Sequence, residues 1–170
     1  ADTLRLYEMY MSDFKDAAPW DTKWIVWIAR FLERVYRAFD LSNWVAIIDD
    51  IDTESDYISD EKSIKLLHKT IKKVSEDIEN YKFNTAIASL MILIKNIPNL
   101  NNRDTKWFDF RRTFIKLLHP FAPHISEELW EQEKILIEKY WEFTIETEEL
   151  KKSIFNTTWP KFNPEMIIDD

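Results

Sequence analysis

The side chains in this sequence best suited to chemistry are lysines that can bind phosphate groups. Five of them recur at spacings that place them on one side of a helix: Lys62, Lys65, Lys69, Lys72 and Lys73. At about 100° per residue, they lie roughly opposite the apolar stripe of the same segment. Such a face suits sequence-independent contacts with a nucleic-acid backbone. Glu61 and Glu76 dilute it, so a face that is only solvated by water fits the pattern equally well.

A second basic group belongs to a segment further upstream. Counted at the same helical angle, four cations fall together beside Trp27: Lys23, Arg30, Arg34 and Arg37. A solvated helix face is the simpler interpretation of this group, and a strip that binds phosphates is the alternative.

Groups suited to catalysis are scarce. The sequence has three histidines, at 68, 119 and 124, and neither glycine nor cysteine. Without glycine, it holds no Walker loop and no dinucleotide-binding fingerprint. His119 and His124 flank a proline corner, where we expect capping or packing rather than metal binding. We therefore predict no catalytic residue, no metal site and no cofactor within this chain.

Composition indicates one folded domain. The chain has 170 residues, of which 45% are hydrophobic and 32% charged, as in globular proteins. Its net charge of −8 is a poor overall match for nucleic acid, so any contact with RNA requires a local basic face. No apolar run approaches the roughly 20 residues of a membrane span. The absence of cysteine fits a cytoplasmic location, and a start at Ala1 rather than Met suggests a piece of a longer protein.

The elements that must position these residues are helices. Apolar residues recur with steps of three and four, and no segment shows the alternation of an independent strand. Asp2 or Thr3 is the expected N-cap of the first helix, and Asp21 or Thr22 that of the second. The pattern predicts an all-α, up-and-down helical bundle with short connections. The predicted helices lie within 1–14 and over 22–39, 59–79, 83–94 and 104–118, with a further short one within 146–154.

The segment HPFAPHISEELW, residues 119–130, predicts two helices joined at a corner. Pro120 and Pro123 lack a backbone donor and push the preceding residue out of the helical region. Ser126, followed by two glutamates, is expected in or near the first turn of the next helix, where acidic groups favour the helix dipole. The apolar pattern weakens after this segment, so we expect that helix to be short.

Four separated regions of the chain resemble bacterial leucyl-tRNA synthetases, which are class I enzymes. Residues 1–14 are similar to the segment after the catalytic loop, and residues 19–37 to the first long helix of the anticodon-binding domain. Residues 67–91 are similar to its central helices and carry the most leucine-specific match. Residues 119–130 and the later TWPKFNPEM resemble its end. The 119–130 match alone would also fit isoleucyl-, valyl- or methionyl-type enzymes.

The resemblance implies how the chain is divided and what it does. It implies that 1–18 end the catalytic-core and stem-contact region, that 19–158 form the anticodon-binding-type helical bundle, and that 159–170 form an extended tail leading to a C-terminal domain. The His-x-Gly-His-type and Lys-Met-Ser-Lys-type adenylation signatures are absent from this stretch. Leucylation, with its ATP and Mg²⁺, is therefore expected of a whole enzyme rather than of these residues.

The implied partners are tRNA(Leu) and the enzyme's own catalytic and C-terminal domains, in the cytoplasm and without a membrane. The chain is expected to hold the tRNA by its backbone. The predicted phosphate contacts are Lys69, Lys72 and Lys73, followed by Arg30 and Arg34. The alternatives are the equivalent domain of an isoleucyl-, valyl- or methionyl-type enzyme, or a helical protein-interaction bundle with no role in RNA binding.

The sequence departs from the family pattern at glycine positions. About 12 glycines are expected at a background near 7%, yet there are none, and there are eight tryptophans. Trp24 and Trp27 stand where the family usually has small residues, mostly glycine, Trp44 lies in a loop that often carries glycine, and Ser12 replaces a usual glycine. One hypothesis explains these three tryptophans but not Ser12: the source uses UGA as a glycine codon, and the sequence translates it as tryptophan. Deliberate or natural loss of glycine is the alternative.

Overall fold

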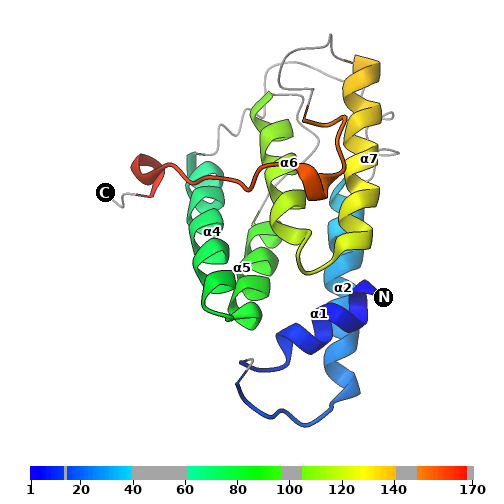
Figure 1. Cartoon of the computed structure of the whole chain (residues 1–170), viewed down its shortest axis with the longest axis vertical. Coiled ribbons are helices and arrows are strands. Elements are labelled where there is room, and N and C mark those ends of the chain that lie inside the picture. The colour runs from blue at the N-terminus through cyan, green and yellow to red at the C-terminus, as the bar shows by residue number, and fades with distance from the viewer. Residues whose placement is uncertain (14, 40–60, 97–104, 141–148, 168–170) are drawn as a thin grey trace.

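The computed structural model describes residues 1–13, 15–39, 61–96, 105–140 and 149–167, and over these ranges it contains helices and no strand (Figure 1). This confirms the predicted all-α class. The elements in chain order are α1 (Asp2–Tyr10), α2 (Thr22–Phe39), α4 (Glu61–Glu79), α5 (Phe83–Lys95), α6 (Thr105–Leu118), α7 (Pro123–Tyr140) and two 3-10 turns, η2 (Ile154–Asn156) and η3 (Pro164–Met166).

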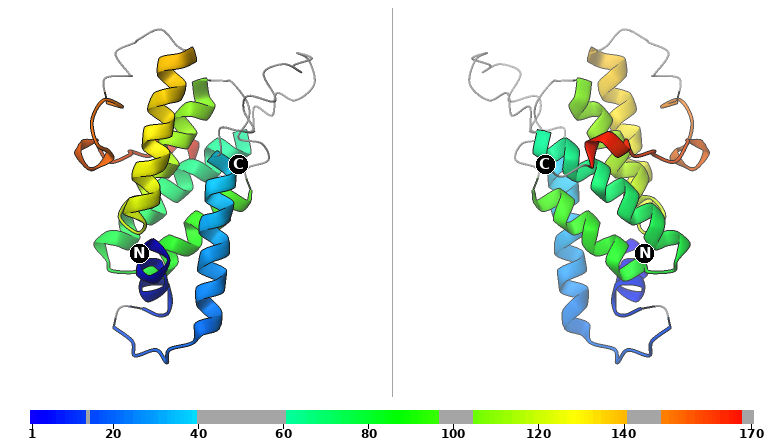
Figure 2. Two further views of the ribbon diagram at one scale, coloured as in Figure 1. Left: turned by 90° about the vertical axis from the view of Figure 1, so that its right-hand side faces the viewer. Right: turned by 90° about the vertical axis from the view of Figure 1, so that its left-hand side faces the viewer.

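Two helical hairpins form most of the bundle. Helices α4 and α5 make the most extensive packing contact, and α6 packs against α7 (Figure 1). Helix α1 lies across α2, α5 and α7, and the N-terminal end of α2 projects with the α1–α2 connection from one end of the molecule (Figure 2). Trp130, Phe39 and Phe114 are among the largest buried side chains of the shared core.

Helix α2 begins where the sequence predicts. Asp21 Oδ1 accepts a hydrogen bond from Lys23 N at 2.9 Å, which is the geometry of an N-cap. The side chain of Tyr7 ties α1 to the same point, because its hydroxyl exchanges hydrogen bonds with the backbone N–H and C=O of Asp21 at 2.9 and 3.0 Å. Buried Ile28, Phe31 and Val35 then follow at helical spacing.

The predicted break between α4 and α5 is a tight turn at Tyr81. Lys82 N donates to Asp77 O at 2.8 Å and Tyr81 N to Ile78 O at 3.2 Å, the paired hydrogen bonds of a Schellman motif. Tyr81 occupies the position of this motif that usually holds glycine, with φ of 59°. A side chain with a Cβ is strained in this left-handed region, so the turn forms at an energetic cost.

Helix α7 begins where predicted but runs further than predicted. It starts at Pro123, so Ser126 lies at the end of the first turn, where its buried hydroxyl makes no hydrogen bond with a described residue. It runs to Tyr140 instead of ending early. The apolar stripe is hard to follow in the sequence because a buried charged residue, Glu133, interrupts it between Trp130 and Leu136.

Asp2 does not cap its own helix, which corrects the prediction of Asp2 or Thr3 as its N-cap. The N-cap of α1 is Ala1, and the Asp2 carboxylate reaches across to the start of α7. Its Oδ2 accepts from Ile125 N at 2.8 Å, and its Oδ1 lies 2.7 Å from Nδ1 of His124. A carboxylate at this point satisfies a free N–H and opposes the positive end of the helix dipole.

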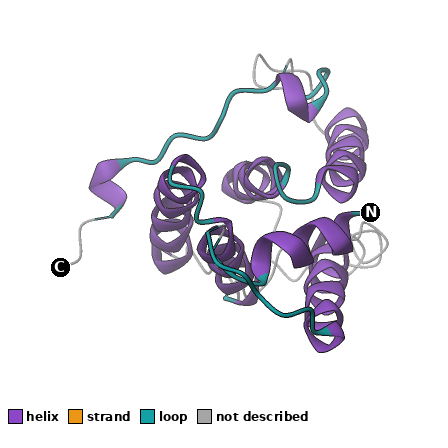
Figure 3. Cartoon of the chain, turned by 60° about the horizontal axis from the view of Figure 1, so that its bottom comes forward, coloured by secondary structure: helices purple, strands orange, loops and turns teal. Residues whose placement is uncertain are grey.

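Residues 149–167 follow the outside of the bundle (Figure 1). The predicted short helix within 146–154 is wrong for its described part, which forms a turn at 149–152 and then η2, while 146–148 lie outside the described residues. We call residues 157–167 the C-terminal tail. It is extended up to η3, as predicted for its first residues, and runs from η2 beside α7 to η3 beside α4 (Figure 3).

Candidate functional site

The α4 lysines predicted to bind phosphate differ in their burial and in how closely they are paired with carboxylates of the same helix. Lys73 pairs with the nearly buried Asp77 at 2.6 Å, and Asp77 in turn accepts from Thr85 Oγ1 at 2.6 Å. Lys72 is 44% exposed and lies 4.0 Å from Glu76. Lys69 is half-buried on the same helix. Lys73 is thus paired with the carboxylate that links α4 to α5 through Thr85, whereas Lys72 has the longer ion pair.

The predicted arginines form a separate group on α2. Arg30 and Arg34 are both exposed, and the Arg30 guanidinium lies 5.4 Å from the ring centroid of the exposed Trp27. Helix α2 packs against α1, α5 and α7, while α4 packs against α5, α6 and η3. The structure therefore places the two predicted groups on different parts of the bundle and does not bring them into one cluster.

The C-terminal tail lies along one edge of the α4 lysine face, which no local sequence pattern indicates. The Trp159 indole N–H donates to Ser75 Oγ at 2.8 Å. Asn163 N donates to His68 Nδ1 at 3.1 Å. Between these anchors, the Phe162 ring centroid lies 5.8 Å from Lys72 Nζ. The tail is thus part of the surface that surrounds Lys72.

The start of the tail is held by a second set of contacts. Glu149 Oε2 accepts from Lys116 Nζ at 2.8 Å, and its Oε1 accepts from both N and Oγ1 of Thr158 at 3.0 Å. Burial raises the pKa of this carboxyl, but the hydrogen bonds from Lys116 and Thr158 outweigh it and hold the pKa below its ordinary value. Glu149 therefore joins the tail to α6 as a carboxylate.

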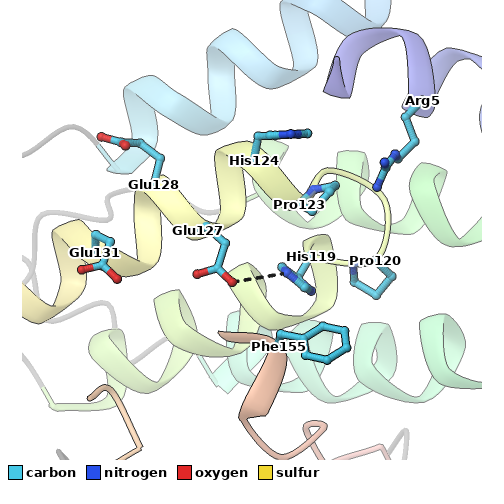
Figure 4. A pocket seen from close by; sticks show the side chains of 9 residues that line it. All are labelled: Arg5, His119, Pro120, Pro123, His124, Glu127, Glu128, Glu131 and Phe155. Atoms are coloured by element: carbon cyan, nitrogen blue, oxygen red, sulfur yellow. Dashed lines mark ion pairs between the residues drawn. The ribbon is translucent and has the colours of Figure 1, made fainter. Parts of the chain in front are cut away.

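The proline corner lines an open hollow of about 830 Å³ (Figure 4). Its imidazoles are engaged with carboxylates: His119 Nε2 lies 3.7 Å from Glu127, and His124 is bonded to Asp2. Burial lowers the pKa of His119, and the nearby carboxylates of Glu127 and Asp2 oppose that shift. Glu127 also accepts from Ser153 Oγ at 2.6 Å. These contacts join α1, α6, α7 and η2. The half-buried His119 thus packs at the corner, as expected, whereas the exposed His124 contacts the Asp2 carboxylate that caps α7.

Two kinds of feature are absent from the described ranges. Within them, no group of three or more His, Cys, Asp or Glu side chains is arranged to hold a metal ion. No helix in the same ranges is both long and apolar enough to cross a membrane.

Comparison with known proteins shows which family and which relatives this chain resembles. The family model described as "Anticodon-binding domain of tRNA ligase" matches residues 60–170. The chain is 38% identical over all 170 residues to a leucine–tRNA ligase of Borrelia hermsii and spans 17% of that protein. It is 43% identical over 134 residues, 79% of the chain, to a leucine–tRNA ligase of Elusimicrobium minutum and spans 15% of it.

A solved structure shows the same fold. The agnB2 LeuRS of Agrobacterium radiobacter K84, crystallised in a ternary complex with tRNA and LeuAMS, aligns with a TM-score of 0.69. The alignment covers 98% of this chain and 20% of that one, at 24% sequence identity. Since the matching family model spans well over half of its residues, the chain belongs to the family of anticodon-binding domains of tRNA ligases.

Proposed function

We propose that this chain is the tRNA-binding helical domain of a leucine–tRNA ligase. The observation that carries the proposal is the 38% identity to such a ligase over the whole length of the chain. The domain would position tRNA(Leu), while the remainder of a longer cytoplasmic enzyme would carry out leucylation with ATP and Mg²⁺. The equivalent domain of an isoleucyl-, valyl- or methionyl-type enzyme is not favoured, because the similar proteins are leucine–tRNA ligases.

The phosphate contacts are proposed on Lys69, Lys72 and Lys73, with Arg30 and Arg34 as a second group. Each lysine that neutralises a phosphate releases a counterion, which makes binding weaken as salt is added. Lys72 is the leading candidate because its side chain is partly exposed and its ion pair with Glu76 is long, at 4.0 Å. Exposed pairs of this kind are worth at most about 1 kcal/mol, so a phosphate can compete with Glu76.

The test is tRNA binding by the full-length ligase with Lys69, Lys72 and Lys73 changed to alanine. Affinity for a tRNA(Leu) transcript is measured over a series of salt concentrations. We expect weaker binding and a flatter salt dependence, by up to about 0.9 in slope for each lysine that neutralises a phosphate in the wild type. A matched variant has three exposed lysines replaced elsewhere: Lys15, Lys95 and Lys152. Equal affinities and slopes for the two variants would refute the site. If the chain is a protein-interaction bundle instead, both variants should keep the affinity and the slope of the wild type.

A further inference from the structure

We propose that Lys161, in the C-terminal tail, is a further phosphate-contacting residue of the α4 surface, positioned there by docking of the tail. This inference rests on the proposed function, since it concerns the same RNA-facing surface. It adds a residue outside α4 and gives a role to the contacts that hold the tail in place.

The first step is the path of the tail. Its two anchors on α4 are Ser75, which contacts Trp159, and His68, which contacts Asn163. The helical anchors are seven residues apart, about 10 Å at 1.5 Å per residue, and the four steps of extended chain between the tail anchors span about 13 Å. The tail thus runs antiparallel to α4 at nearly matched length, and Lys161 lies midway between the anchors.

The second step is the balance of charge along this edge. Three of the α4 lysines already face carboxylates: Lys65 lies 3.1 Å from Glu61, Lys72 lies 4.0 Å from Glu76, and Lys73 lies 2.6 Å from Asp77. Lys161 is exposed and forms no ion pair with any residue in the described part of the chain. A phosphate that approaches α4 must compete with a carboxylate at these lysines but meets no such competitor at Lys161.

The third step is the neighbour of Lys161 in the tail. Phe162 places its ring 5.8 Å from Lys72 Nζ, close enough for a cation–π contact. Lys161 and Phe162 are adjacent in sequence, so the same docked segment that contacts Lys72 also carries the Lys161 cation. Docking therefore fixes the backbone of Lys161 one residue away from the ring that contacts Lys72.

The experiment measures binding of a tRNA(Leu) transcript to the full-length ligase with Lys161→Ala. At low salt we expect affinity to fall by about fivefold, and the slope of log affinity against log salt to flatten by about 0.9, the value for removal of a single lysine–phosphate interaction. The control is Lys15→Ala, an exposed lysine in the α1–α2 connection, which should leave both quantities unchanged.

A second variant tests the positioning role of the tail. His68→Ala removes the acceptor of the Asn163 amide, so hydrogen exchange in 159–163 should accelerate and tRNA affinity should fall. In the Lys161→Ala background, the same change should cost less affinity than in the wild type, because the two act through one contact. Fully additive effects on affinity, or faster exchange with unchanged binding, would overturn the positioning role.

The outcomes separate this inference from the proposed function. If the triple variant at Lys69, Lys72 and Lys73 weakens binding while Lys161→Ala does not, the inference about Lys161 is wrong and the proposed site stands. If neither variant differs from its control, both are wrong. If only Lys161→Ala weakens binding, the tail carries the contact and the assignment on α4 is wrong.

Discussion

Nε of Arg111 donates a hydrogen bond to Oε1 of Glu133 across 2.6 Å, with both side chains fully buried between α6 and α7. The same guanidinium donates to the backbone oxygen of Phe39 at 3.3 Å and lies 4.6 Å from the centre of its ring. Burial raises the pKa of Glu133, and the charge of Arg111 opposes that shift. The pair therefore fixes the end of α2 to the α6–α7 hairpin, at the expense of desolvating two charges.

The pair predicts an asymmetric response to mutation. Arg111→Met alone should lower the free energy of unfolding by about 3–5 kcal/mol, because it leaves the Glu133 carboxylate buried without its partner. The double variant Arg111→Met/Glu133→Leu should lie close to the wild type or above it, since well-packed apolar residues replace both charges. Urea unfolding of the three proteins measures this. If the double variant is as unstable as the single variant, apolar packing does not replace the ion pair, and the buried charges themselves stabilise the fold.

Much of the fold could be predicted from local sequence, because most helices carry an uninterrupted apolar stripe. The start of α2 needed only the cap at Asp21 and the spacing of its apolar residues. Helix α7 was predicted too short for the converse reason: Glu133 occupies a core position, and its partner on α6 lies 22 residues away in sequence. A buried charge that is satisfied from a distance cannot be recognised by local periodicity.

The surroundings of the candidate site were not predictable in the same way. Spacing alone places the α4 lysines on one face, but it cannot show that the tail lies beside Lys72. Trp159 and Ser75 are 84 residues apart, and Asn163 and His68 are 95 apart. Asp2 is a similar case, because it caps α7 from 123 residues away instead of its own helix. Each contact depends on the packed bundle rather than on a sequence motif.

The turn at Tyr81 offers a stabilising substitution. Tyr81→Gly should raise the free energy of unfolding by up to about 1 kcal/mol, because glycine adopts positive φ without a steric penalty. The Tyr81 ring centroid also lies 6.1 Å from that of Phe83. Tyr81→Ala is therefore the control, because it removes the tyrosine ring but keeps a Cβ. The Tyr81→Gly protein should be more stable than the Tyr81→Ala protein in thermal or urea unfolding. Equal stability of the two variants would mean that the left-handed conformation is not strained.

Docking of the tail should depend on pH through His68. Burial lowers the pKa of His68 below its ordinary value of 6.5, and its Nδ1 accepts from Asn163 N only when it is unprotonated. His68 is neutral while the tail is docked, and its imidazole protonates near pH 6.5 once the tail is released. Docking of the tail is therefore fully stable above that pH. It weakens as pH falls toward the lower pKa of the docked state. The charged residues that flank His68 along α4 and Asn163 along the tail are Lys65, Lys69, Lys72, Lys161 and Glu165.

The measurement is the hydrogen-exchange protection factor of the Asn163 amide between about pH 7.5 and about pH 5. Protection should decline on acidification in the wild type. His68→Gln provides the control, because its side-chain oxygen can accept the same hydrogen bond without titrating. Protection that falls equally in both proteins would assign the pH dependence to other groups, such as Glu149, whose lowered pKa also makes it a stabilising carboxylate that acid removes.

The tryptophans provide a prediction about the identity of the residues themselves. Trp130 is fully buried and its indole N–H donates to Lys152 O at 3.0 Å, so this position requires an indole. Trp24 and Trp27 are 49% and 61% exposed on the first turns of α2, and neither belongs to the buried core, although the Trp24 ring centroid lies 6.2 Å from that of Tyr10. Peptide masses from protein isolated from its native host should therefore show glycine at 24 and 27 and tryptophan at 130. Trp44 lies outside the described residues.

The two forms should also differ in stability. Glycine is less favourable than other residues inside a helix by up to about 1 kcal/mol relative to alanine. The form with glycine at 24 and 27 should thus have a slightly less stable start of α2, seen as faster amide exchange there than in protein made with tryptophan. Absence of the Trp27 ring also removes the contact with Arg30, leaving that guanidinium able to reach a phosphate. Peptide masses that show tryptophan at positions 24 and 27, or UGG codons there, would refute the hypothesis that UGA encodes glycine in the source.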